Sequence, residues 1–159
     1  MKRKLILVSN AILLLLFVTI AACSKKDFNP ILRATLNGVE METDDFDPEA
    51  YQYLDSEKAI SVSGILNKDK RVISIKMRGI EPGTYIGFDN NNVRALISVG
   101  TASGYYVSDS IGGRAIITLT KNDNVNRAVE GTFSGTVVSV DNPADSIKIT
   151  KGIFRSVYQ

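Results

Sequence analysis

The chain has 159 residues, with 19 Lys and Arg against 17 Asp and Glu, one Cys, and neither His nor Trp. The lack of His excludes Ser-His-Asp and Cys-His catalysis and imidazole metal ligands, and a single Cys excludes an intrachain disulfide and a cysteine zinc site. The length suits one domain that buries a core without such cross-links.

Residues 1–22 are typical of a lipoprotein signal peptide. A basic start at residues 2–4 precedes an apolar run at residues 11–20, which is shorter than the ~20 residues that a membrane-spanning helix needs. The run ends in Ile-Ala-Ala-Cys at residues 20–23, which resembles a bacterial lipobox. We therefore expect cleavage before Cys23 and acylation of that residue. The alternative is an uncleaved anchor helix in which the Cys is incidental.

Acyl chains on Cys23 are expected to tether a domain, residues 30–159, to a membrane of the cell envelope through a polar segment, residues 23–29. Ser24 stands where many lipoproteins held at the inner membrane have Asp, so we expect the outer membrane, on either leaflet. Cleavage removes the three basic residues of the signal and leaves a near-neutral chain. Nucleic acid is excluded as a partner because its phosphates need a basic face.

After the signal, β-branched residues outnumber Leu and alternate with polar residues at the period of a strand. Asn37-Gly38 predicts a type I′ hairpin turn, and a bulge at Lys151-Gly152 would bring Phe154 to the core side of its strand. Residues 47–58 fit this pattern worst and are compatible with a helical turn. Strands are predicted at residues 31–36, 39–43, 59–64, 72–77, 85–88, 93–99, 105–108, 114–120, 128–140 and 147–157.

About nine or ten short antiparallel strands at this spacing predict a single all-β domain, either a β-sandwich or a flattened barrel. Each strand should bury one of its two faces, because successive side chains point to opposite sides. The residues predicted to form the core are Ile60, Val62, Ile73, Ile75, Ile97, Ile117, Leu119, Phe133, Val137, Ile149 and Phe154.

Four short motifs follow one another along the domain: Ala-Thr-Leu-Asn-Gly at residues 34–38, Gly-Thr-Tyr at 83–85, Val-Glu-Gly-Thr-Phe-Ser at 129–134 and Ile-Thr-Lys-Gly-Ile-Phe at 149–154. In this order, after a Cys and a short polar tether, they resemble a family of small envelope lipoproteins from Bacteroidota whose function is unknown. The resemblance implies an all-β lipoprotein and no catalytic residue. It also implies that the Gly and Phe positions lie in turns, bulges and the core.

Acidic residues crowd into residues 40–49, where Asp44, Asp45 and Asp47 are candidate ligands for Ca²⁺, an ion that takes 6–8 oxygen atoms. Their spacing is not that of an EF-hand loop. The alternative is a solvated loop, and we expect the domain to fold without a metal or cofactor.

Three tyrosines, Tyr85, Tyr105 and Tyr106, are the candidate ligand-binding residues, because exposed aromatic rings stack on sugars. The alternative is that such rings cap the ends of the core with the hydroxyl group in water. Tyr105 and Tyr106 are consecutive, so they point to opposite faces of a strand and only one of them can serve a given platform.

We expect no enzyme, because the acids cluster in turns, whereas glycosidase chemistry needs two carboxyl groups placed across a cleft. The expected function is a non-catalytic binding or interaction module of the cell envelope, with envelope proteins or glycans as partners. The alternatives are a structural lipoprotein that docks on an envelope assembly and a glycan-binding module.

Overall fold

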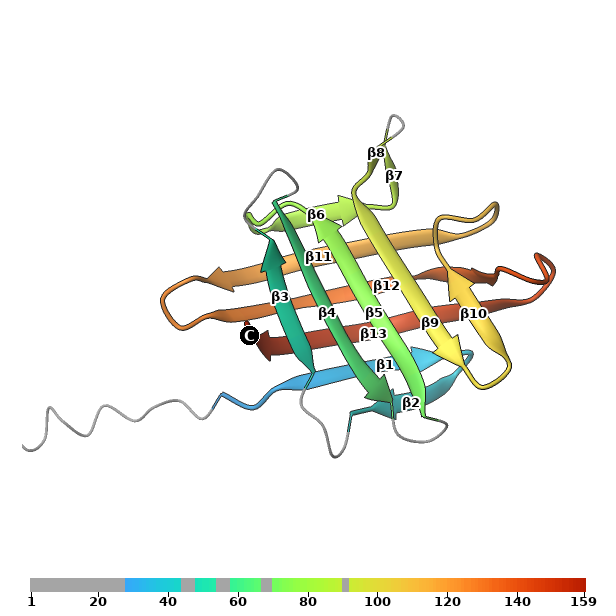
Figure 1. Ribbon diagram of the computed structural model, residues 1–159, viewed down its shortest axis with the longest axis horizontal. Helices are drawn as coiled ribbons and strands as arrows, with labels where there is room; N and C mark the ends of the chain where they lie inside the picture. The colour runs from blue at the N-terminus through green and yellow to red at the C-terminus, as the bar shows by residue number, and fades with distance from the viewer. Residues whose placement is uncertain (1–27, 44–47, 54–57, 67–69, 90–91) are drawn as a thin grey trace, which may run out of the picture.

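A computed structural model describes residues 28–43, 48–53, 58–66, 70–89 and 92–159. Within these ranges every regular element is a β-strand, and the main sheet contains eleven antiparallel strands. Figure 1 shows that this sheet curls over itself, so that the strands of one layer cross those of the other at a steep angle. No helix in the described part of the chain is long and apolar enough to cross a bilayer.

The two layers are built from different parts of the chain. The back layer contains β6 (Gly83–Ile86), β11 (Arg114–Asp123), β12 (Ala128–Ser139), β13 (Ser146–Val157), β1 (Ile31–Leu36) and β2 (Val39–Glu42), in this spatial order. The front layer contains β10 (Gly104–Val107), β9 (Ala95–Thr101), β5 (Arg71–Arg78), β4 (Ala59–Leu66) and β3 (Glu49–Tyr53). A separate two-stranded hairpin consists of β7 (Phe88–Asp89) and β8 (Asn92–Val93).

Strand β12 joins the layers. It pairs with β11 up to Thr136, which lies opposite Arg114, and then with β10, where Ser139 lies opposite Tyr106. At the other side of the molecule, an isolated bridge links Ala50 of β3 to Tyr158, just after β13. The sheet is therefore a flattened, curled barrel, and the all-β prediction is confirmed.

The space between the layers is filled by the inward side chains of both. All eleven residues predicted to form the core are buried. Leu32 and Leu36 of β1, Leu66 of β4 and Met77 of β5 join them. Because the layers bury alternate residues, the other face of each strand is left for solvent or a partner.

The predicted turn after β1 is confirmed. Asn37 and Gly38 both have positive φ, 48° and 85°, as a type I′ turn requires. The turn is also fixed to β13, since the Asn37 amide donates to the Lys148 carbonyl at 2.9 Å and the Lys148 amide donates to Asn37 Oδ1 at 2.8 Å.

The helical turn considered for residues 47–58 is wrong where the structure describes that segment. Residues 49–53 form β3, which pairs with β4 from Glu49 opposite Ser63 to Tyr53 opposite Ala59. Ala50 is buried there and Tyr51 is exposed, so the strand has the usual alternation over a length too short for a strong pattern. With β7 and β8, it raises the number of described strands to thirteen rather than nine or ten.

The predicted bulge in β13 is also confirmed. Two residues, Thr150 and Lys151, occupy the space that Ser134 alone occupies in β12. The bulge places Gly152 opposite Phe133, and Gly131 lies opposite Phe154. The two strands thus exchange glycine–phenylalanine pairs on the core side, and the two rings lie with centroids 6.5 Å apart.

Candidate functional site

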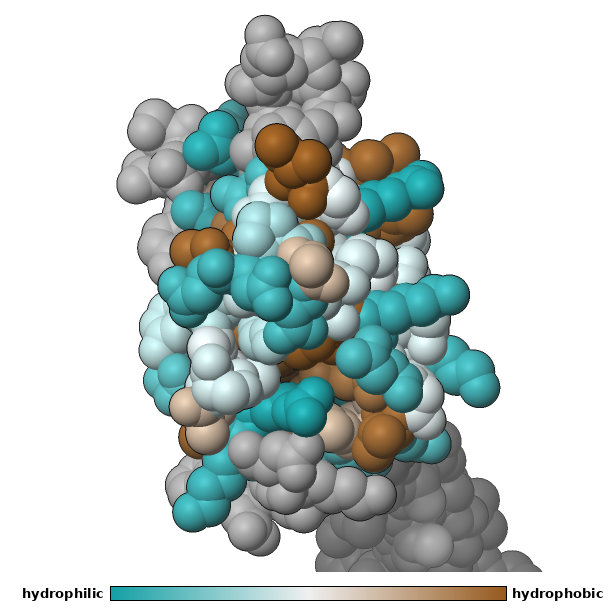
Figure 2. Space-filling model, turned by 90° about the vertical axis from the view of Figure 1, so that its right-hand side faces the viewer, coloured by the Kyte–Doolittle hydropathy of each residue, from teal (hydrophilic) through white to brown (hydrophobic). Residues whose placement is uncertain are grey.

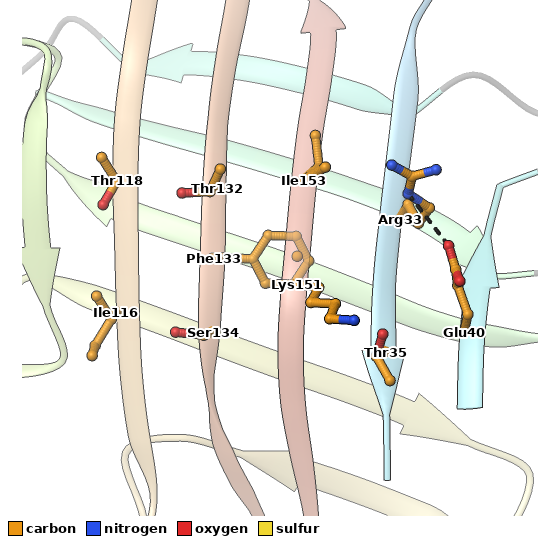
Figure 3. Close-up of a pocket in the computed structure, with 11 residues that line it drawn as sticks. Arg33, Thr35, Glu40, Ile116, Thr118, Thr132, Phe133, Ser134, Lys151 and Ile153 are labelled. Carbon is orange, nitrogen blue, oxygen red and sulfur yellow. Dashed lines mark ion pairs between the residues drawn. The ribbon is translucent and has the colours of Figure 1, made fainter. Parts of the chain in front are cut away.

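An open groove of about 560 Å³ crosses the outer face of the back layer (Figure 3). Two rows of outward side chains form it, each row running across the strands. Thr118, Thr132, Ile153 and Arg33 lie in register in the first row. Ile116, Ser134, Lys151, Thr35 and Glu40 lie along the second. Phe133, only 3% exposed, contributes to the floor beside Gly152.

The lining surface of the groove is mostly apolar and includes two isoleucine side chains, and four hydroxyl groups, from Thr35, Thr118, Thr132 and Ser134, lie among these apolar contacts. One of these hydroxyls is already engaged, since Thr118 Oγ1 lies 3.1 Å from Thr84 Oγ1. A hydroxyl group both donates and accepts, so the lining retains free hydrogen-bonding capacity. Nothing in the sequence distinguishes these outward Thr and Ser residues from an ordinary solvent-facing row.

Lys151 is held in the groove by the bulge. Its φ is +52°, a left-handed conformation that glycine adopts most easily, and its side chain is exposed. It makes no hydrogen bond or ion pair with the described residues. In Figure 3 the ammonium group points along the groove toward Thr35. The sequence predicted the bulge because it brings Phe154 to the core side of β13. It did not predict the second effect of the bulge, which is the placement of this cation.

Arg33 supplies a second positive charge, which is partly neutralised. Its Nε lies 3.7 Å from Glu40 Oε1 and its Nη1 lies 4.0 Å from Glu42 Oε2, both on the edge strand β2. These exposed pairs are long, and such pairs contribute about 1 kcal/mol or less to stability. The lining therefore contains two cations and one acid, which leaves it with a net positive charge.

The lining has no acid–base pair. Glu40 is its only carboxylate, is exposed and faces Arg33. Within the ranges the structure describes, no three Cys, Asp or Glu side chains are grouped to hold a metal ion. The calcium candidates Asp44, Asp45 and Asp47, like the lipidation candidate Cys23, lie outside the described residues.

The three candidate tyrosines do not share a surface. Tyr105 is 51% exposed on the outer face of the front layer. Tyr106, 8% exposed, donates a hydrogen bond of 2.6 Å to Asp145 Oδ2. Tyr85 is half-buried and donates to the Glu81 carbonyl at 2.6 Å, with its ring against Gly79. Of the three, Tyr105 alone presents most of a ring to solvent.

Tyr105 belongs to a row of exposed apolar side chains across the front layer. Ile65 lies opposite Val72, Val72 opposite Gly100, and Gly100 opposite Tyr105. The Val140 amide donates to the Tyr105 carbonyl at 3.0 Å and extends the row by one residue. We call Ile65, Val72, Tyr105 and Val140 the apolar row. The sequence shows each of them as an isolated outward residue, and only the register of the strands brings them together.

Buried tyrosines close both ends of the core and should make the fold sensitive to alkali. Burial raises the pKa of Tyr158, whose hydroxyl donates to Asn122 Oδ1 at 2.5 Å, and the bond to Asp145, then burial, raises the pKa of Tyr106. A raised pKa means that the folded state favours the neutral phenol. The contribution of these two phenols to the stability of the fold is therefore complete below about pH 10 and is lost as the pH rises above it.

We therefore expect the free energy of unfolding to fall as the pH rises above about 10. Tyr158→Phe should cost about 1 kcal/mol at pH 7, the usual worth of a hydrogen bond, and should make the alkaline decline shallower. Urea unfolding at several pH values between 8 and 11 measures both effects. Equal alkaline slopes in the two proteins would contradict this explanation.

Comparisons with known proteins bear on residues 29–158, almost the whole described domain. A search of the curated proteins and a search of the solved structures found no match. A family model does match over that range, and its description is a domain of unknown function, DUF6252. The chain therefore belongs to the DUF6252 family.

Proposed function

We propose that this protein is a lipoprotein of the cell envelope, anchored through Cys23 on the outer membrane, and that it is a non-catalytic binding module. The groove on the back layer is the proposed binding surface. Lys151 is the observation that carries this proposal. Its left-handed backbone costs roughly 1–2 kcal/mol, and unlike Lys70, which has nearly the same φ outside the groove, Lys151 places a cation with no partner among the described residues beside the hydroxyl groups of the lining.

The chemistry of the lining favours an acidic saccharide as the ligand. Thr35, Thr132 and Ser134 offer hydroxyl groups to sugar hydroxyls, and Ile116 and Ile153 offer apolar contacts to C–H groups. The ammonium group of Lys151 suits a carboxylate, because a charge-assisted hydrogen bond is about twice as strong as one between neutral groups. The groove is open and its lining residues come from five strands, so it suits an extended chain better than a single sugar.

A glycan array probed with the chain from Ser24 onward tests this ligand class. We expect binding to oligosaccharides that contain uronic acids and much weaker binding to their neutral counterparts of equal length. Raising the salt concentration should weaken the interaction, because an exposed ammonium–carboxylate contact is screened. Equal binding to acidic and neutral saccharides would show that Lys151 gives the groove no preference for a charged ligand.

The lipid anchor has its own test. Cys23→Ser should abolish labelling by a fatty-acid analogue and move the protein from the membrane fraction to the soluble fraction, because the acyl chains supply the membrane affinity. Ser24→Ala is the matched control and should leave both labelling and fractionation unchanged. If Cys23→Ser protein is still labelled and still sediments with membranes, the proposed anchor is wrong.

A second candidate function is supported by the apolar row. A structural lipoprotein that docks on an envelope assembly needs an exposed apolar surface, and Val72 of β5 and Tyr105 of β10 provide one on the outer face of the front layer. In this case cross-linking in native membranes should capture a protein partner that Val72→Ser with Tyr105→Ser releases, while no glycan binds. Glycan binding that survives this double substitution favours the groove instead.

A further inference from the structure

The β11–β12 hairpin displays an apolar side chain at its tip. Val125 is 92% exposed there. Asp123 Oδ1 accepts hydrogen bonds from the amides of Val125 and Asn126 at 3.1 and 3.0 Å, and Asp123 Oδ2 accepts one from the Asn126 side chain at 2.8 Å. These bonds from Asn126 hold the pKa of Asp123 well below its usual value. The turn is thus fixed in the ionised state, with Val125 pointing outward.

This tip lies at the end of the domain where β1 begins. Ile31, the first residue of β1, is opposite Arg155, and Arg155 is opposite Glu130 of β12. From Glu130 to Asn126 the chain runs four residues further, roughly 13 Å at the rise of a strand. Figure 1 shows the turn between β11 and β12 at the same end as the start of β1 and the C-terminus.

The distance from Cys23 to the domain limits which end can meet a membrane. Eight residue steps separate Cys23 from Ile31, and whatever their conformation they span at most roughly 29 Å. From Arg155 to Ser146, at the remote end of β13, there are nine steps, or roughly 30 Å. A lipid on Cys23 can therefore bring the hairpin end against a bilayer, but cannot reach past the remote end.

We propose that the tip of the β11–β12 hairpin, Val125 with the neighbouring Arg127, is a second contact with the lipid surface, which orients the domain once Cys23 is acylated. This inference rests on the proposed anchor. One valine buries too little surface to hold a protein on a membrane by itself. Arg127 is exposed and makes no ion pair with the described residues, so it is available to anionic headgroups. In this orientation the groove opens sideways, away from the bilayer.

The remote end carries a matched control. Ile111, in the loop before β11, is 97% exposed, yet it lies at the end of β11 that is opposite to the hairpin. Figure 2 looks onto this side of the molecule, where hydrophilic residues predominate and hydrophobic residues lie in separate places. Val125 and Ile111 are therefore similar in apolar character and exposure but differ in their distance from the proposed anchor.

The experiment uses the full acylated chain in vesicles of phosphatidylethanolamine and phosphatidylglycerol. Val125→Cys and Ile111→Cys each introduce one free thiol, because Cys23 is the only native Cys and its sulfur is acylated. Each thiol carries a polarity-sensitive fluorophore, and spin-labelled lipid is the quencher. We expect quenching at position 125 to be several-fold stronger than at position 111. A label at Asn124→Cys should lose its quenching when Val125→Asp is added.

The outcomes separate this inference from the anchor. If the protein stays with the vesicles but the labels at 125 and 111 are quenched equally, the hairpin does not contact lipid and the inference fails alone. If Val125→Asp leaves the quenching at position 124 unchanged, the apolar tip has no role and the inference also fails. If the unsubstituted protein leaves the vesicles altogether, the proposed anchor fails and this inference fails with it.

Discussion

Replacing Gly152 by Ala should lower the free energy of unfolding by about 3 kcal/mol, at the upper end of the range for overpacked cores. A Cβ atom at Gly152 would lie 2.5 Å from the Phe133 carbonyl oxygen and 2.6 Å from its ring. Gly131→Ala should have a similar effect, because its Cβ would lie 2.3 Å from the Phe154 ring and 2.4 Å from the Thr118 carbonyl oxygen. Urea unfolding of each variant measures the loss.

Gly100→Ala is the matched control for these substitutions. Gly100 also lies in a strand, but the nearest atoms to its Cβ would be 3.8 Å away, which is ordinary contact. Its replacement should change stability by less than about 1 kcal/mol, since Ala is not worse than Gly in a strand. If Gly152→Ala is no more destabilising than Gly100→Ala, the close packing between β12 and β13 is not what requires glycine.

These glycines give a physical meaning to two of the motifs in the sequence. Gly131-Thr132-Phe133 and Gly152-Ile153-Phe154 pair antiparallel, so each Phe ring lies over the Gly of the other strand. A phenylalanine that covers a strand glycine replaces the contacts that the missing side chain would make. Shortening Phe133 to Leu should therefore recover part of the stability lost in Gly152→Ala, which a double-mutant cycle would reveal.

Local patterns predicted much of the fold. The alternation around Ile73 and Ile75, the Asn37-Gly38 turn and the bulge at Lys151 each depend on a few neighbouring residues, and the structure confirms all three. Strand β3 was not predicted, because two tyrosines that alternate within five residues do not outweigh the polar residues around them. Local patterns also did not predict that β12 pairs with both β11 and β10, because this pairing depends on contacts between residues far apart in the chain.

The candidate surfaces were harder to predict than the core. A buried face is marked by apolar residues, whereas an outward Thr132 or Ser134 is the same residue type in a groove and on a plain surface. The apolar row shows the same limit, since Val72 and Tyr105 become neighbours only through the register of β5, β9 and β10. Tyr106 could be assigned to the opposite face from Tyr105 by parity alone, and the structure buries it.

Lys151→Gly should abolish binding of an acidic saccharide while leaving the domain at least as stable as before. Glycine adopts a φ of +52° without the steric cost that Lys151 bears, and this gain is partly offset by the larger entropy that glycine loses on folding. We expect stability to stay the same or rise by up to about 1 kcal/mol. Binding should fall because the groove loses the one cation in its lining that no carboxylate faces.

The matched control is Lys70→Gly, which removes another exposed lysine with a left-handed backbone, φ 51°, in the turn before β5 and outside the groove. It should match Lys151→Gly in stability and retain full binding. Lys151→Arg keeps the charge at the same backbone conformation and should keep most of the affinity.

Loss of binding in both glycine variants would point to a general effect of charge. Loss of stability without loss of binding in Lys151→Gly would mean that Lys151 serves the bulge rather than a ligand. If Lys151 is instead retained for its charge, its replacement by glycine removes binding without loss of stability, because a strained residue of this kind costs stability and is kept for what it binds.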